Sequence, residues 1–241
     1  MNNYLLKWPL PVEIMTFIRR KNRFISEMLD STGLKVEVHS PNTGSMKNLL
    51  LPGSRCLVHN TGKVDRKYPF SWISVENEGV WVGIDTIFTN KIAGKLIRDG
   101  FIPDLTDILS ITPEVKTGQS RLDFKVVTRS GFNVWIEVKN VTLLENKTAL
   151  FPDAVTERGI KHLEELMTLK VPDHRCIMLY IINRGDAEFF DAAREIHKAY
   201  ESQLKSAIKK GVEIFPVVMH CDTTGVKFLK FAEISENLLS P

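Results

Sequence analysis

The stretch "RLDFKVVTRSGFNVWIEVKNVTL", residues 121–143, predicts a β-hairpin that carries charged side chains where a sheet is usually apolar. Asp123 lies near the start of the first strand, and Glu137 and Lys139 lie two residues apart near the end of the second. Side chains alternate between the two faces of a strand, so Glu137 and Lys139 share one face and Val138 takes the other. If the two strands pair, Asp123 lies close to Glu137 at one end of the hairpin.

These three charged residues form a set that is suited to metal-assisted hydrolysis of a phosphodiester. Two carboxylates at close range repel each other unless a cation lies between them, and Mg²⁺ or Mn²⁺ suits oxygen ligands of this kind. Lys139 would then orient a water molecule, help to remove its proton, or stabilise the charge that develops on the phosphate. The alternative is an ordinary ion pair of Lys139 with Asp123 or Glu137 on an exposed sheet face.

The elements around the hairpin predict a mixed α/β fold over residues 86–241. The apolar run "RCIMLYIIN" (175–183) is typical of a buried parallel strand. An Asp–x13–Glu–x–Lys spacing on consecutive strands between two helices is the arrangement of the PD-(D/E)xK nuclease-like fold, and this context favours the active-site interpretation. We predict helices over 86–100, 152–170 and 188–211, and strands over 111–117, 122–128, 133–139, 175–183 and 212–219.

Residues 1–85 differ from the rest, because they predict short strands with tight connections and no helix. A small closed barrel such as the OB-fold is the natural arrangement for such strands. We therefore expect an OB-like nucleic-acid-binding domain over 1–85 and a PD-(D/E)xK nuclease-like domain over 86–241. Phe70 and Trp72 suit either stacking on nucleic-acid bases or the barrel core. The predicted strands cover 22–29, 34–39, 55–60, 70–75 and 80–84.

The excess positive charge of the chain lies in its first third. Residues 1–85 hold 11 Lys and Arg against 8 Asp and Glu, a net of +3, which is also the net charge of the whole chain. The cluster "RRKNR" (19–23) is typical of phosphate binding, although a solvated surface is an equal alternative. The candidate nucleic-acid-binding residues are Arg19, Arg20, Lys21, Arg23, Asn42, Thr43, Arg66, Lys67, Tyr68 and Arg158.

Several classes of protein are disfavoured by the sequence. Its longest notable apolar run, "IMLYII" (177–182), is far too short to span a membrane, and the N-terminus lacks the pattern of a signal peptide. The three cysteines are scattered, so neither disulfides nor a thiolate zinc site is expected. The histidines show no metal spacing, and we assign them no role. We expect a cytoplasmic protein that does not associate with membranes.

The chain resembles the sugar fermentation stimulation protein (SfsA) family of bacteria and archaea over nearly its whole length. The resemblance implies the two domains predicted above, non-specific DNA binding, and a role in regulating sugar, particularly maltose, metabolism. It also implies that Asp123, Glu137 and Lys139 match the nuclease triad of the family. The stretches that carry it are "HSPNTGSM" (39–46), "RKYPFSW" (66–72), "SRLDF" (120–124), "IEVKNVTL" (136–143) and "FPDAVTERGIKHLEELM" (151–167).

Three further positions are candidates with open alternatives. Glu114 is either an additional metal ligand or a surface acid on an edge strand. Arg158 either binds phosphate from the first turn of its helix, or lies beside a Glu157–Lys161 surface pair. Asn42, Thr43 and Ser45 in "PNTGSM" either present a phosphate site or form a plain turn.

Two functional hypotheses follow from the sequence. The first is a nucleic-acid-binding protein with a divalent-metal nuclease site that acts on DNA, with RNA as an open possibility. The second is a DNA-binding regulator whose nuclease-like domain is catalytically silent. A sequence-specific repressor is disfavoured, because no helix-turn-helix signature is present.

Overall fold

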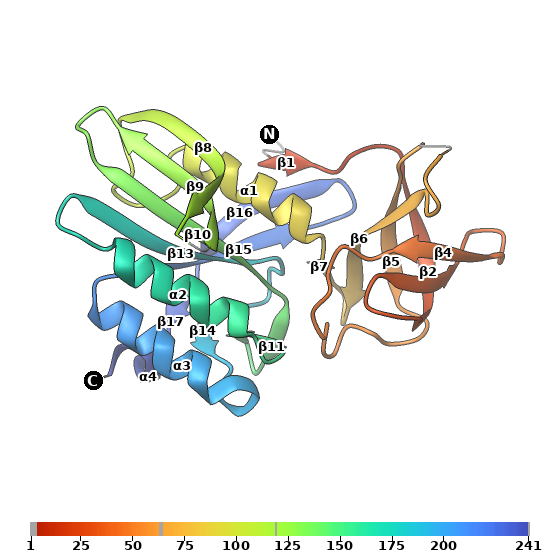
Figure 1. The fold of residues 1–241 in the computed structure, drawn as a ribbon. Coiled ribbons are helices and arrows are strands. Elements are labelled where there is room, and N and C mark those ends of the chain that lie inside the picture. Colours follow the sequence, from red (N-terminus) through yellow and green to blue (C-terminus); the bar gives the residue numbers. More distant parts are fainter. Residues whose placement is uncertain (1–3, 63–64, 119, 241) are drawn as a thin grey trace.

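The computed structural model describes residues 4–62, 65–118 and 120–240, and the chain forms a β-barrel beside an α/β domain (Figure 1). The barrel order is β4-β3-β2-β5-β6, and parallel pairing of Val38 with Phe70 joins β4 to β6 and closes it. Closure removes the exposed edges that an open sheet would present. The strands are β2 (Val12–Arg20), β3 (Ile25–Leu29), β4 (Lys35–His39), β5 (Arg55–Asn60), β6 (Phe70–Asn77) and β7 (Val80–Gly83).

The barrel confirms the predicted OB-like fold and settles the role of one aromatic residue. The five predicted strands correspond to β3–β7, whereas β2 was not predicted. Trp72 is fully buried and stacks on Phe17 at 5.3 Å between ring centroids. Trp72 therefore belongs to the barrel core, and its indole N–H is satisfied by the carbonyl of Ser74 at 2.9 Å. Phe70 is half-buried against the same core.

The first described residues pack against the second domain. The short strand β1 (Leu6–Lys7) pairs with β16 (Gly225–Phe231), and the Trp8 ring lies 4.7 Å from that of Phe88. A second link between the two parts is the pairing of Trp81 with Cys221. The division of the chain after residue 85 stays a prediction.

The second domain is built on a mixed sheet of order β15-β13-β10-β9-β8, in which β10, β13 and β15 run parallel. The predicted hairpin is β9 and β10, paired antiparallel, and the buried run at 175–183 is the central strand β13; both predictions are confirmed. The strands are β8 (Ile108–Thr117), β9 (Ser120–Thr128), β10 (Asn133–Val141), β13 (His174–Ile182) and β15 (Glu213–Cys221).

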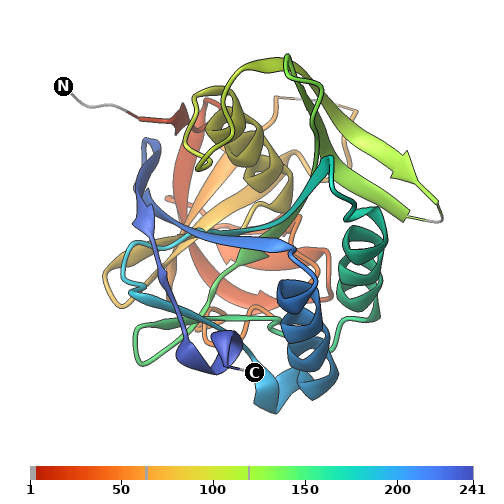
Figure 2. The ribbon, with the colours of Figure 1, turned by 90° about the vertical axis from the view of Figure 1, so that its left-hand side faces the viewer.

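Helices cover both faces of this sheet (Figure 2). Helix α1 (Thr86–Arg98) packs on one face, while α2 (Glu157–Leu169) and α3 (Arg194–Lys209) pack on the other. Asp85 caps α1 by accepting from the N–H groups of Ile87 and Phe88. Thr156 caps α2 by accepting from the Gly159 N–H, so α2 begins at Glu157 and the predicted helix over 152–170 was wrong in its first five residues.

The prediction of one long helix over 188–211 was wrong at its N-terminal end. Residues Phe189–Ala192 form strand β14, and α3 begins at Arg194. Phe190 is fully buried whereas Phe189 is 40% exposed, which is the alternation of a strand. The pairing with β12 that stabilises this strand is not visible in the local sequence. The small sheet has the order β11-β12-β14-β17, from β11 (Leu143–Glu145), β12 (Thr148–Phe151), β14 and β17 (Glu233–Ile234), and a short helix α4 (Glu236–Leu239) follows.

The length and hydropathy of a helix decide whether it can span a membrane. Among the described residues, no helix is both long and apolar enough to cross a lipid bilayer.

Candidate active site

Asp123 lies where the pairing of β9 and β10 ends. The ladder stops at the pair Ile136–Phe124, and the next backbone N–H, that of Val138, donates to Asp123 Oδ2 at 2.8 Å instead of to a carbonyl. The amide of Asn90 on α1 donates to the other oxygen, Oδ1, at 2.8 Å. The carboxyl group is thus held by a strand and a helix, which fixes its orientation.

Glu137 and Lys139 share one face of β10, as predicted, and His162 of α2 packs against both. Lys139 Nζ donates to Glu137 Oε1 at 2.5 Å, and His162 Nδ1 lies 2.9 Å from Lys139 Nζ and in contact with the same carboxylate oxygen. Glu137 is 2% exposed and His162 is 4% exposed, so these groups depend on one another for polar contacts. The ion pair of Lys139 with Glu137 does form, but it is buried, so the prediction of an ion pair on an exposed sheet face is wrong.

The surroundings of the two carboxyl groups shift their pKa values in opposite directions. Burial and the nearby charge of Glu137 raise the pKa of Asp123 to about 6. Burial also opposes the charge on Glu137, yet the charge of Lys139 and the hydrogen bond with His162 hold the pKa of Glu137 below its usual value. Pairs of acids whose environments separate their pKa values are typical of catalytic sites.

The residues present fit a divalent cation. Within the described part of the chain, Glu137 Oε2 is buried without a hydrogen-bond partner, and such an oxygen is costly unless something binds it. Mg²⁺ is commonly held by one or two carboxylates together with water and substrate phosphate, so Asp123 and Glu137 meet its needs. Glu114 lines the same pocket, but its side chain is 57% exposed and lies 3.6 Å from Arg121, and its role as a ligand stays a prediction.

A pocket of about 510 Å³ opens over this cluster. Arg158 lines it from the first turn of α2, and Arg158 Nε lies 3.3 Å from His162 Nε2. Sequence analysis assigned no role to His162. The available signal was its position one helical turn after Arg158, within the distinctive stretch 151–167, but a lone histidine on a helix has no spacing that marks it.

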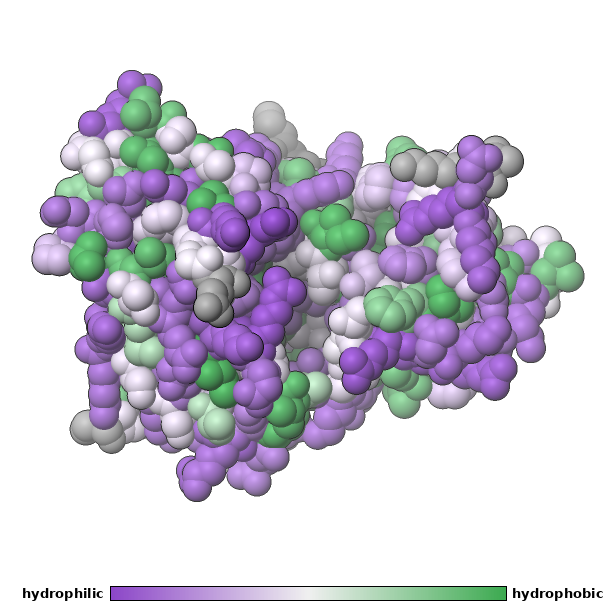
Figure 3. Space-filling model, viewed as in Figure 1, coloured by the Kyte–Doolittle hydropathy of each residue, from purple (hydrophilic) through white to green (hydrophobic). Residues whose placement is uncertain are grey.

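The predicted nucleic-acid-binding residues separate into groups. Arg20, Arg23, Asn42 and Thr43 line a second pocket, of about 590 Å³, in the recess between the barrel and the α/β domain, where hydrophilic residues gather (Figure 3). Arg19 and Lys21 lie apart from it, in ion pairs with Glu27 and Glu37 at 2.6 Å each.

The remaining predicted residues lie in the loop between β5 and β6. Lys67 Nζ stands 5.3 Å from the centre of the Tyr68 ring, and Arg66 is half-buried nearby. Arg66, Lys67 and Tyr68 line neither of the two pockets.

Comparison with known proteins identifies the family. The protein-family model described as "SfsA N-terminal OB domain" matches residues 18–84. A second family model, "Sugar fermentation stimulation protein RE domain", matches residues 87–225. A sugar fermentation stimulation protein homolog of Pelobacter propionicus is 42% identical over 84% of this chain and 88% of its own length. A homolog of Synechocystis is 34% identical over 96% of this chain and 99% of its own.

A solved structure shows the same fold. Pyrococcus furiosus SfsA in complex with Ca²⁺ superposes with a TM-score of 0.88 at 25% identity, covering 97% of this chain and 99% of that one. The chain belongs to the sugar fermentation stimulation protein family.

Proposed function

We propose that this member of the sugar fermentation stimulation protein family binds DNA without sequence specificity and hydrolyses its phosphodiester bonds with Mg²⁺ or Mn²⁺. The observation that carries the proposal is the buried cluster of Asp123, Glu137 and Lys139. In this cluster the pKa of Asp123 is raised, the pKa of Glu137 is lowered, and the Lys139 ammonium group donates to Glu137. The Ca²⁺ bound by the Pyrococcus furiosus relative supports the use of a divalent cation.

Each residue of the cluster has a role that follows from its contacts. A bound cation supplies Lewis-acid chemistry at the phosphate, with Asp123 and Glu137 as its protein ligands. Lys139 places a positive charge beside the reacting phosphate and can orient the water that attacks it. His162 holds Lys139 and Glu137 in place from α2, and Asn90 fixes Asp123 from α1. Arg158 stands at the rim, where its guanidinium can hold a neighbouring phosphate.

The barrel supplies the remaining phosphate contacts in this proposal. Arg20 and Arg23 face the recess that leads to the cluster, so a strand held by the barrel passes the candidate site. The family name supports a link to sugar fermentation, and we include regulation of sugar, particularly maltose, metabolism in the cytoplasm within the proposal.

The second candidate is a DNA-binding regulator whose nuclease-like domain does not turn over. One observation favours it: over residues 4–62, 65–118 and 120–240, no three His, Cys, Asp or Glu side chains gather as ligands for a metal ion. In this conformation Glu137 Oε1 is already engaged by Lys139 and His162.

A cleavage assay separates the two candidates. The protein is incubated with supercoiled plasmid, single-stranded oligonucleotides and branched DNA in Mg²⁺ or Mn²⁺, and binding is measured separately in EDTA by fluorescence anisotropy. We expect cleavage by the wild type and by Asp173→Ala, whose side chain is exposed after α2, but not by Asp123→Ala or Lys139→Met. All four proteins should bind DNA. Binding without cleavage of any substrate by the wild type would leave the silent regulator as the function.

A further inference from the structure

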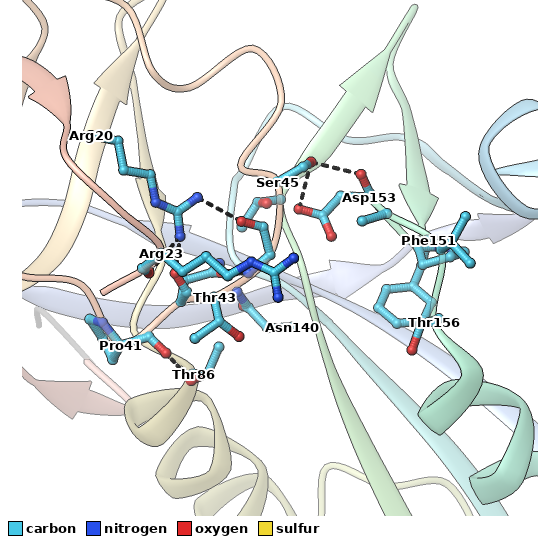
Figure 4. Close-up of a pocket in the computed structure, with 16 residues that line it drawn as sticks. Arg20, Arg23, Pro41, Thr43, Ser45, Thr86, Asn140, Phe151, Asp153 and Thr156 are labelled. Atoms are coloured by element: carbon cyan, nitrogen blue, oxygen red, sulfur yellow. Dashed lines mark hydrogen bonds between the residues drawn. The ribbon is translucent and has the colours of Figure 1, made fainter. Parts of the chain in front are cut away.

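The pocket of about 590 Å³ between the two domains adjoins the candidate active site. Four residues, Thr86, Asn140, Phe151 and Thr156, line both pockets. Arg20 and Arg23 of the barrel form one side of the larger pocket, and Phe151 and Thr156 of the α/β domain form the other (Figure 4). A ligand in this pocket therefore lies directly beside a phosphate bound at Asp123 and Glu137.

The walls of this pocket are held together by a contact between the domains. Ser45 Oγ donates to the carbonyl of Asp153 at 2.7 Å (Figure 4). The Met46 N–H donates to Asp153 Oδ2 at 2.9 Å. Gly44 permits this approach, because a Cβ there would lie 2.9 Å from Asp153 Oδ2. The barrel and the α/β domain are therefore in direct contact at the wall of the pocket.

The positive charge that faces the pocket is not neutralised by an ion pair. Arg20 and Arg19 are neighbours in β2 and point to opposite sides, so Arg19 pairs with Glu27 while Arg20 turns to the pocket. The guanidinium of Arg20 donates to the carbonyls of Gly44 and Asn42 at 2.7 and 2.6 Å. Within the described residues, neither Arg20 nor Arg23 has a carboxylate within 4.0 Å. Asp153 also lines the pocket and its charge acts on Arg20, so two guanidinium groups stand against one carboxylate and the pocket keeps a net positive charge for an anionic group.

The other walls suit a base and a sugar rather than a bare phosphate. Phe151 presents a half-buried aromatic ring, and Val155 beside it is 66% exposed. The side chains of Thr43 and Thr156 add hydroxyl groups that can donate or accept. The volume falls in the range of about 300–1,000 Å³ that is typical of small-molecule sites. A charge for phosphate, an aromatic face and polar edges together match one nucleotide.

We propose that this pocket takes one nucleotide of the bound strand, unstacked from its neighbours, with its phosphate on Arg20 and Arg23 and its base towards Phe151. This inference rests on the proposed function and specifies its substrate. A base in a duplex enters such a pocket only after leaving its pair and its stack, which costs a few kcal/mol. The preferred substrates are therefore single strands, flaps and frayed ends rather than intact duplex.

The test uses oligonucleotides that carry the fluorescent base 2-aminopurine at successive positions, bound to the full chain in EDTA so that no cleavage occurs. We expect the fluorescence of a labelled single strand to rise on binding, because a protein without sequence specificity places each base in the pocket in some complexes, and unstacking there relieves quenching. Single strands should bind at least about ten-fold more tightly than blunt duplex, since ten-fold corresponds to about 1.4 kcal/mol and unpairing costs more.

Two substitutions and one control localise the effect. Arg23→Met removes an exposed, unpaired guanidinium from the pocket, and Thr43→Trp fills the pocket from an exposed loop position. Both should abolish the fluorescence rise. Arg55→Met, which removes a barrel arginine that is paired with Glu76 outside the pocket, should leave the rise unchanged.

The outcomes distinguish the nucleotide pocket from the proposed nuclease function on which it rests. Normal binding and cleavage with no rise in fluorescence, or with equal preference for blunt duplex, would overturn the nucleotide pocket and leave the nuclease proposal standing. Failure to bind any DNA would overturn both. Binding of a free deoxynucleoside monophosphate as tight as that of the oligonucleotide would assign the pocket to a free nucleotide instead and overturn the inference.

Discussion

Replacing Asp123 with asparagine should stabilise the metal-free protein at neutral pH, although Asp123 belongs to the proposed catalytic cluster. The asparagine oxygen can still accept from the Val138 N–H, and its amide can pair with Asn90 after that side chain rotates. What the substitution removes is a buried negative charge beside Glu137, which burial and repulsion both disfavour.

The size of the effect follows from the pKa of Asp123, which is raised from 3.8 to about 6. The folded state holds this proton more tightly than the unfolded chain, so this group's contribution to stability is lost as pH rises between the two values and stays lost above pH 6. Each pKa unit corresponds to about 1.4 kcal/mol, so a shift of about two units gives a penalty of about 3 kcal/mol. Asp123→Asn should recover up to that amount at pH 8 and nearly none at pH 4.

Urea unfolding in EDTA at pH 8, 6 and 4 measures this difference directly. Adding Mn²⁺ at 1,000 times its Kd should then reverse the order at pH 8, because a ligand that binds only the folded wild type adds about 4.1 kcal/mol at that concentration. An Asp123→Asn protein that is less stable than the wild type by the same amount at every pH would refute the electrostatic reasoning.

Three further effects are expected. Gly44→Ala should lower the free energy of unfolding by about 1–3 kcal/mol in urea denaturation, since its Cβ would displace Asp153 from the contact between the domains; unchanged stability would show that the contact adjusts without cost. Tyr180→Phe should cost about 1–3 kcal/mol in thermal unfolding because it leaves the buried Tyr200 hydroxyl without its partner at 2.6 Å, whereas Tyr180→Phe with Tyr200→Phe should recover most of that loss. The logarithm of the DNA-binding constant measured by anisotropy should fall linearly with the logarithm of salt concentration, and a flat dependence would contradict phosphate contacts by Arg20 and Arg23.

The sequence determined the elements whose signal is local. The hairpin of β9 and β10, the buried run of β13 and the amphipathic pattern of α2 were predictable, because side-chain periodicity reports which faces are buried. The shared face of Glu137 and Lys139 followed from the same periodicity, since two residues apart on a strand always point the same way. The family resemblance then placed this pair in a nuclease-like domain, as the comparisons confirm at the level of fold.

Local periodicity was insufficient where a segment depends on a distant partner. Residues 189–192 were assigned to a helix, but they form β14 because β12 offers them a parallel edge. A short apolar run fits a helix or a strand equally well, and only the neighbouring chain decides between them.

The tertiary structure alone decided which groups act together. His162 comes from α2, 23 residues after Lys139, and reaches Glu137 and Lys139 only because α2 packs on that face of the sheet. Arg19 and Arg20 are adjacent arginines in one basic cluster of the sequence. In the structure Arg19 is paired with Glu27, whereas Arg20 faces the pocket between the domains. Charge and reactivity at these positions are set by burial and by neighbours that packing brings from distant parts of the chain, and no local pattern records that approach.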